Sequence, residues 1–93
     1  MSIEEFQTKL ETIIKEFPIS GFDAIPDSTM AGLNICAGET EKLGMKTGKE
    51  VLENLITALK TRKAGGNTDD SVLVRLTALE FYAQKLKDGT AEN

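Results

Sequence analysis

The sequence predicts an all-α protein, a small and roughly antiparallel bundle of about four helices with short loops. Apolar residues recur at steps of three and four along most of the chain, which is the period of an amphipathic helix. Gly and Pro residues interrupt this pattern and divide it into segments. At 93 residues the chain has the length of a single domain, residues 1–93. Helices are expected near residues 2–17, 28–43, 47–63 and 69–88.

The first predicted helix has the clearest beginning and end. Ser2 and Glu5 have the spacing of a capping box, and Pro18 ends the helix because the residue before a proline avoids the α conformation. Its apolar face comprises Ile3, Phe6, Leu10, Ile13, Ile14 and Phe17. The connection that follows is too apolar for a free linker, so Ile19, Phe22 and Ile25 are expected to fold over the core.

The second predicted helix has the weakest pattern. Asp27 or Ser28 is expected to cap it, and Gly32 and Gly38 each weaken it by about 1 kcal/mol relative to Ala. A short strand over 33–37 is the alternative. As a helix, the segment has one apolar face with Met30, Leu33, Cys36, Ala37 and Leu43, and with Thr40 between them.

The third predicted helix opens at a second capping-box pattern, Thr47 with Glu50, and ends at Gly65-Gly66. Its inward side comprises Val51, Leu52, Leu55, Ile56, Ala58 and Leu59. The segment 67–71 is expected to cap the fourth helix, Gly89 to stop it, and 90–93 to fray.

The fourth predicted helix is apolar on two sides. One continuous stripe consists of Val72, Leu76, Leu79, Ala83 and Leu86, widened by Leu73 and Tyr82. A shorter strip, Val74, Ala78 and Phe81, lies on roughly the opposite side, because successive residues of a helix are about 100° apart. The strip must be covered either by the second helix and its preceding loop or by a partner molecule.

Composition limits the classes of partner. The net charge of −4 and the pI of about 4.8 disfavour unspecific binding to nucleic acid, whose phosphates repel an acidic protein. Residues 42–63 are the exception, with six Lys or Arg against two Glu. A single cysteine, Cys36, forms no intrachain disulfide, and we expect a reducing, cytoplasmic location. We expect no membrane span, since no stretch approaches the required ~20 apolar residues.

The residue types needed for most catalytic and metal sites are missing. The chain has no histidine and one cysteine, which excludes His/Cys zinc sites and Ser-His or Cys-His pairs within it. Paired carboxylates occur, but nothing in the sequence adds the further ligands that a divalent cation needs. We therefore expect no enzyme activity, no metal and no cofactor.

Two short motifs resemble known sites and depart from them. The segment 44–50 (GMKTGKE) resembles a phosphate-binding loop, but its glycines are one residue too close and Glu50 stands at the magnesium-ligand position. Asp27-Ser28 is similar to the Asp-Ser-Leu motif of acyl carrier proteins, in which Ser28 would hold phosphopantetheine. Here Thr29 replaces the leucine, and no counterpart of the last long helix is expected in that family.

The chain lacks the usual catalytic groups and has an apolar strip beyond what its core needs. These two observations favour a non-enzymatic protein–protein interaction module, such as an adaptor, a small chaperone or a self-associating protein. Its predicted partner-binding residues are Val74, Ala78 and Phe81. The alternative is a nucleic-acid-binding protein of helix-turn-helix type, because the Leu-Gly turn near residue 44 lies in the basic third of the chain. Its contact residues would be Lys42, Lys46 and Lys49.

Overall fold

The prediction of an all-α bundle is confirmed. The computed structural model describes residues 1–17, 22 and 25–92, which form four helices and no strand. Each helix begins and ends within two residues of the range expected from the sequence. The helices are α1 (Ile3–Lys15), α2 (Asp27–Leu43), α3 (Lys46–Lys63) and α4 (Asp69–Asp88). The alternative of a strand over 33–37 is wrong, since α2 is continuous.

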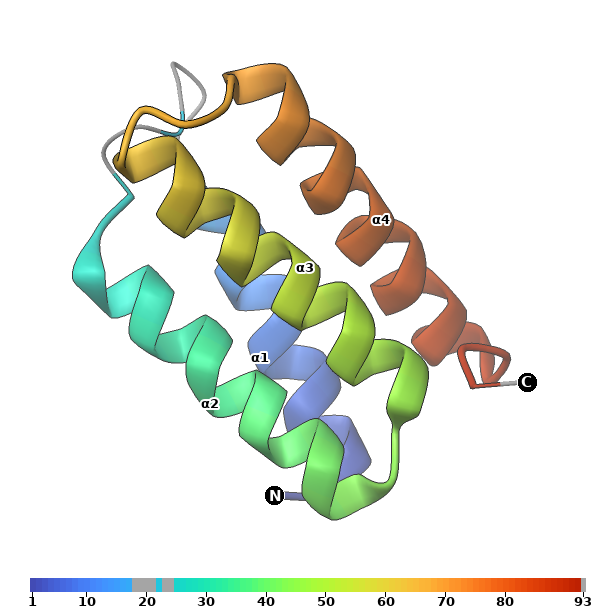
Figure 1. Ribbon diagram of the computed structural model, residues 1–93. Helices are drawn as coiled ribbons and strands as arrows, with labels where there is room; N and C mark the ends of the chain where they lie inside the picture. The colour runs from blue at the N-terminus through green and yellow to red at the C-terminus, as the bar shows by residue number, and fades with distance from the viewer. Residues whose placement is uncertain (18–21, 23–24, 93) are drawn as a thin grey trace.

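The four helices stand at the corners of a square and alternate in direction (Figure 1). Neighbours along the chain pack together, and α1 closes the square against α4. No Cα atom of α2 lies within 8 Å of one in α4, and the same holds for α1 and α3. This is the arrangement of an up-down-up-down bundle, which short connections favour.

The core lies between the helices and takes one stripe from each. Its fully buried apolar side chains are Phe6 and Leu10 of α1, Leu33 and Cys36 of α2, Leu52 and Leu55 of α3, and Val72 and Leu79 of α4. Phe22 and Ile25 pack against this core as expected, whereas Ile19 lies outside the described residues. Ile3 was expected on the buried face of α1 but is 53% exposed, because it sits in the first turn, beyond the end of the core.

The expected caps agree with the structure only in part. Ser2 and Glu5 form the capping box at the start of α1. The box expected from Thr47 and Glu50 is wrong, since the N-cap of α3 is Met45, two residues before Thr47, and no side chain of that cap makes a hydrogen bond. The cap expected at Asp27 or Ser28 is also wrong, because Pro26 takes the N-cap position of α2 and both residues lie within the helix.

The two glycines within α2 have different surroundings. A Cβ atom built at Gly32 would lie 3.0 Å from Cδ1 of Ile13, so this glycine allows α1 and α2 to approach closely. A Cβ atom at Gly38 would meet nothing within 4 Å. The lost helix propensity therefore has a packing reason at Gly32 and none at Gly38.

We predict that Gly38→Ala raises the free energy of unfolding by about 0.5–1 kcal/mol, because alanine has the higher helix propensity and the site is open. The matched variant Gly32→Ala should gain less or be destabilised, since Ile13 must move. Urea denaturation of both variants measures the difference. Equal gains would contradict the close α1–α2 contact.

Candidate protein-binding surface

The fourth helix has one buried face and one exposed apolar face. Val72, Leu76, Leu79, Tyr82 and Ala83 are buried between α1 and α3. On the opposite side, Val74 is 64% exposed, Phe81 is 66% exposed, and Ala78 between them is exposed. The structure therefore brings the three predicted partner-binding residues together on one surface, hereafter the outer strip.

Of the internal cover considered for these residues, α2 does not reach them, and most of the loop before it, residues 18–21 and 23–24, lies outside the described residues. α2 occupies the corner diagonally opposite α4, so the core lies between α2 and the outer strip (Figure 1). Leu73 was expected to widen the buried stripe, but it is 49% exposed and extends the apolar surface beside Val74. The cause is geometric. The helices α1 and α3 pack against the two flanks of α4, and the side chain of residue 73 projects outside the region that these two helices cover.

A shallow hollow of about 220 Å³ lies beside Phe81, lined also by Thr77, Glu80 and Gln84. The small residues Thr77 and Ala78 lie between Val74 and Phe81. The surface is therefore less raised at its middle than at the two large side chains on either side. Exposed apolar residues scattered singly are ordinary on proteins, whereas contiguous ones mark contact surfaces. Full burial of a side chain such as Phe or Val is worth about 1.5–3 kcal/mol, which a partner would supply here.

We predict that Phe81→Gln changes the free energy of unfolding by no more than about 0.5 kcal/mol, because the ring is exposed and glutamine is a good helix former. Leu79→Ala on the buried side of the same helix should cost about 2–5 kcal/mol. Thermal or urea unfolding of the two variants checks the contrast. A large loss for Phe81→Gln would mean that the ring belongs to the core.

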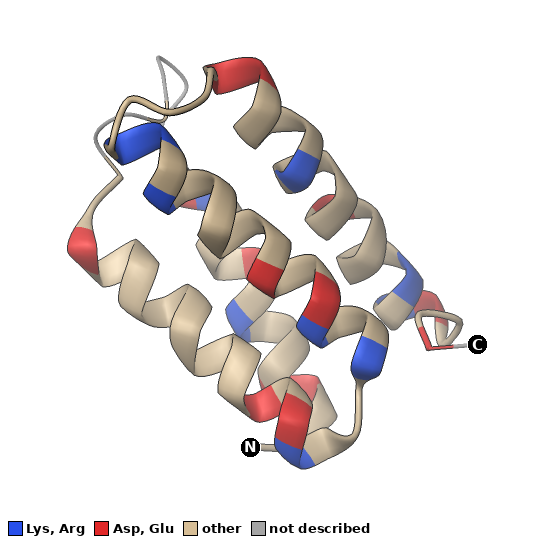
Figure 2. Ribbon diagram, in the orientation of Figure 1, with Lys and Arg blue, Asp and Glu red and all other residues tan. Residues whose placement is uncertain are grey.

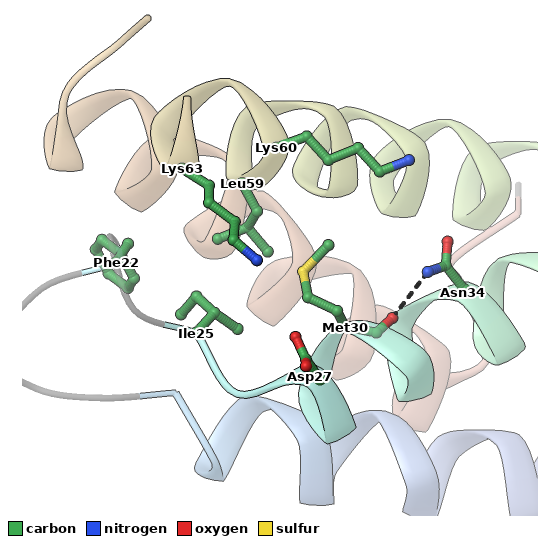
Figure 3. Close-up of a pocket in the computed structure, with 8 residues that line it drawn as sticks. All are labelled: Phe22, Ile25, Asp27, Met30, Asn34, Leu59, Lys60 and Lys63. Atoms are coloured by element: carbon green, nitrogen blue, oxygen red, sulfur yellow. Dashed lines mark hydrogen bonds between the residues drawn. The ribbon is translucent and has the colours of Figure 1, made fainter. Parts of the chain in front are cut away.

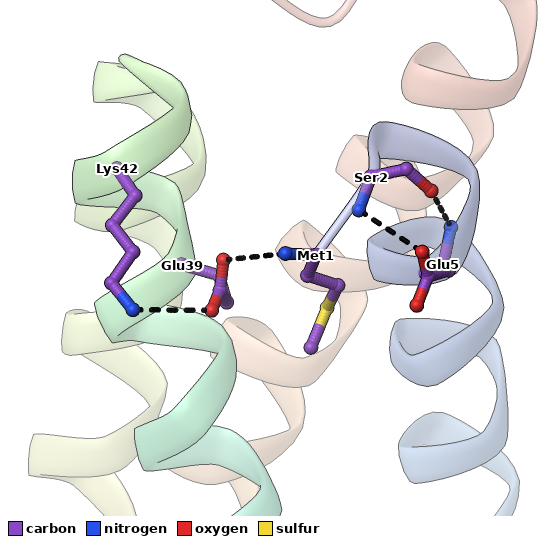
Figure 4. A network of polar contacts seen from close by, with 5 residues as sticks. All are labelled: Met1, Ser2, Glu5, Glu39 and Lys42. Atoms are coloured by element: carbon purple, nitrogen blue, oxygen red, sulfur yellow. Dashed lines mark hydrogen bonds and ion pairs between the residues drawn. The ribbon is translucent and has the colours of Figure 1, made fainter.

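Two of the three basic residues of the alternative hypothesis lie beside carboxylates at the α2–α3 turn, and the third, Lys46, is the exposed first residue of α3. Lys42 Nζ lies 3.6 Å from Glu39, and Lys49 Nζ lies 3.3 Å from Glu41. Glu39 also forms an ion pair with the Met1 amino group, at 3.7 Å (Figure 4). Figure 2 shows acidic and basic positions mixed at this end of the bundle. Carboxylates so close to the lysines would repel the phosphates of a nucleic acid.

The geometry of the turn also differs from a helix-turn-helix. In that motif the two helices cross at about 90–120°, so that the second can enter the major groove. Here α2 and α3 lie side by side and run in opposite directions (Figure 1). Gly44, with φ of 69°, closes α2 in the left-handed conformation, and Met45 is buried directly after it. The turn is that of an αα-hairpin.

A polar cluster that the sequence did not predict joins the end of the chain to the start of α3. The carboxylate of Glu92 accepts the backbone N–H groups of Thr47 and Gly48, each at 3.0 Å, and the hydroxyl of Tyr82. Residues 90–93 were expected to fray, and residue 93 lies outside the described part of the chain. Ala91 is nevertheless buried, and Glu92 supplies the cap that Thr47 and Glu50 do not. Two backbone amides of the segment 44–50, which resembles a phosphate-binding loop in sequence, thus bind a carboxylate of the same chain.

Gly48 makes this cluster possible, since a Cβ atom there would lie 2.5 Å from the Tyr82 hydroxyl oxygen. Burial raises the pKa of Tyr82, and the hydrogen bond to Glu92 raises it further. For Glu92, burial acts to raise the pKa, but the hydrogen bonds from Tyr82, Thr47 and Gly48 outweigh it. The pKa of Glu92 therefore lies below its ordinary value.

The lowered pKa of Glu92 makes the free energy of unfolding depend on pH in a definite direction. A carboxyl with a lowered folded-state pKa stabilises the protein above its unfolded pKa of about 4.3, and the effect is lost as pH falls through the folded value. We predict that Glu92→Gln costs about 1 kcal/mol at pH 7, comparable with the loss of a helix cap. The difference from the parent should shrink as pH falls below about 4. Denaturation at several pH values tests this, and a pH-independent difference would contradict it.

The remaining chemical groups of the described residues do not form a reactive site. Burial, the largest cause, raises the pKa of the Cys36 thiol to about 11, so the thiol is a packing group and a poor nucleophile. No three metal-ligating side chains cluster within the described ranges. Ser28, the residue similar to a carrier serine, is exposed in the first turn of α2.

A second hollow, of about 270 Å³, lies between the start of α2 and the end of α3 (Figure 3). Its apolar part comes from Phe22, Ile25, Met30 and Leu59, which pack against the core. In Figure 3 the Lys63 amino group points toward the hollow, whereas Lys60 extends along α3 away from it. Asp27 and Asn34 also line this hollow, and in Figure 3 the Asp27 carboxylate points toward the same space as the Lys63 amino group.

Comparison of the chain with protein-family models, curated proteins and solved structures gave no match. Among the described residues, no helix combines the length and apolar character needed to cross a membrane. The outer strip of α4 is therefore identified by its geometry alone.

Proposed function

We propose that this protein is a non-enzymatic interaction module that binds a protein partner through the outer strip of α4. The observation that carries the proposal is the joint exposure of Val74, at 64%, and Phe81, at 66%, on one face of a helix whose other face is buried. Protein interfaces are enriched in aromatic side chains, and Phe81 supplies one on the strip.

The surroundings of the strip support the same function. Leu73 adds a further half-exposed apolar side chain, and the hollow beside Phe81 offers a receiving site for a partner's side chain. The helix that carries the strip is fixed by fully buried residues such as Val72 and Leu79. A rigid surface loses little conformational entropy on binding, which favours affinity.

Site-specific photo-crosslinking in producing cells tests the proposal. A photoreactive phenylalanine analogue at position 81 should give adducts of defined mass, because that side chain would lie inside the complex. Position 35 is the matched control, since Ile35 is a single exposed apolar residue, 51% exposed, on the outer side of α2. Adding Val74→Gln should remove the adducts formed at position 81. The proposal fails if positions 81 and 35 give the same pattern or if position 81 gives no adduct.

A further inference from the structure

The outer face of α4 is complementary to itself when reversed. From residue 70 to residue 85 its exposed residues are Asp70, Val74, Thr77 with Ala78, Phe81 and Lys85, and Asp88 follows one turn later. Counted from the midpoint between residues 77 and 78, the two large apolar residues are equally far away on either side, and so are the two charged ones. All of these positions lie on the side of the helix away from the core.

Asp70 and Lys85, at the two ends of this stretch, carry opposite charge, and the further carboxylate of Asp88 accepts a hydrogen bond from Gln84. Asp70 lies in the first turn and Lys85 in the last turn of α4. Within the described part of the chain neither side chain has an ion-pair partner within 4 Å, whereas Asp69 is already bound to Arg62 at 2.9 Å. An antiparallel copy of the helix would bring each Asp70 to the other copy's Lys85, while a parallel copy would bring like charges together.

We propose that the partner of the outer strip is a second copy of this chain, bound through a two-fold, antiparallel α4–α4 contact centred between residues 77 and 78. In this dimer Val74 of each copy faces Phe81 of the other, and Asp70 faces Lys85. The inference rests on the proposed function and names its partner. A two-fold interface requires a surface complementary to itself, and the order of residues on this face supplies one.

The size and shape of the contact predict a weak dimer. The face from Asp70 to Lys85 is about 22 Å long at 1.5 Å per residue. Thr77 and Ala78 at its centre are small, which allows two helices to approach to the usual ~8–10 Å. Because α4 stands at a corner of the bundle, the contact is narrow (Figure 1). Interfaces of this kind fall below the standard ~1,600 Å² and form transient complexes.

Sedimentation equilibrium of the purified full chain between about 10 µM and 1 mM tests the proposal, since weak complexes dissociate in that range. The parent should pass from monomer to dimer with concentration. Phe81→Gln should weaken dimerisation more than about thirtyfold, because two buried rings are lost per dimer. Ile35→Gln on α2 is the matched control and should leave it unchanged.

Charge exchange tests the antiparallel direction. Asp70→Lys alone and Lys85→Asp alone should each weaken the dimer about fivefold, because like charges then face each other. The double variant Asp70→Lys/Lys85→Asp should restore the parent affinity. In a parallel dimer the single changes would have little effect.

Three results overturn the self-docking proposal. They are a parent that stays monomeric at 1 mM, a dimer insensitive to Phe81→Gln, and single charge variants that match the parent. The first of these leaves the proposed function standing if position 81 crosslinks in cells to a protein of different mass. An absence of any specific adduct at position 81 removes both.

Discussion

A four-helix bundle gives each helix a single buried face, and this constraint decides the character of the present molecule. The two helices that contact α4 lie on its flanks, and the third lies across the core. Once Val72, Leu76 and Leu79 are buried, residues half a turn away must face outward. An apolar residue there has no internal cover, however hydrophobic the helix. The outer strip is thus a direct consequence of the packing.

Carboxylates hold α4 at both ends. At its start, Asp69 accepts hydrogen bonds from Arg62 at 2.9 Å and from the backbone N–H of Phe22 at 3.2 Å, and these bonds lower its pKa. Beyond its end, Glu92 binds the first amides of α3 and the hydroxyl of Tyr82. Each contact ties α4 to another part of the bundle. The outer face is therefore presented in a fixed orientation, which lowers the entropy cost of docking.

Charge is arranged differently on the two surfaces considered for function. At the α2–α3 turn, Lys42 and Lys49 are paired with nearby glutamates, so the basic third of the sequence does not form a uniformly positive surface (Figure 2). On the outer face of α4, the charged residues Asp70, Lys85 and Asp88 lie toward the two ends, with Val74, Ala78 and Phe81 between them. An apolar centre with a polar rim is typical of protein interfaces. The contrast favours protein over nucleic acid as the partner.

Local signals along the chain were enough to predict the helices, their order and most of the core. The three-four spacing of Leu and Phe defines the buried stripes, and Gly44 and Gly89 end α2 and α4 in the left-handed conformation that glycine adopts most readily. The sequence pattern also separated Val74, Ala78 and Phe81 from the buried stripe, since that distinction follows from the helical period alone.

Whether a helix covers the strip could not be predicted from local signals, because it depends on which helices become neighbours and which lie diagonally across the core. The same is true of Glu92, which caps α3 from 44 residues away and has no local signature. Leu73 and Ile3 show most directly what the helical pattern cannot predict. Both match the helical pattern of a buried residue, yet one turns past the flanking helices and the other lies beyond the end of the core.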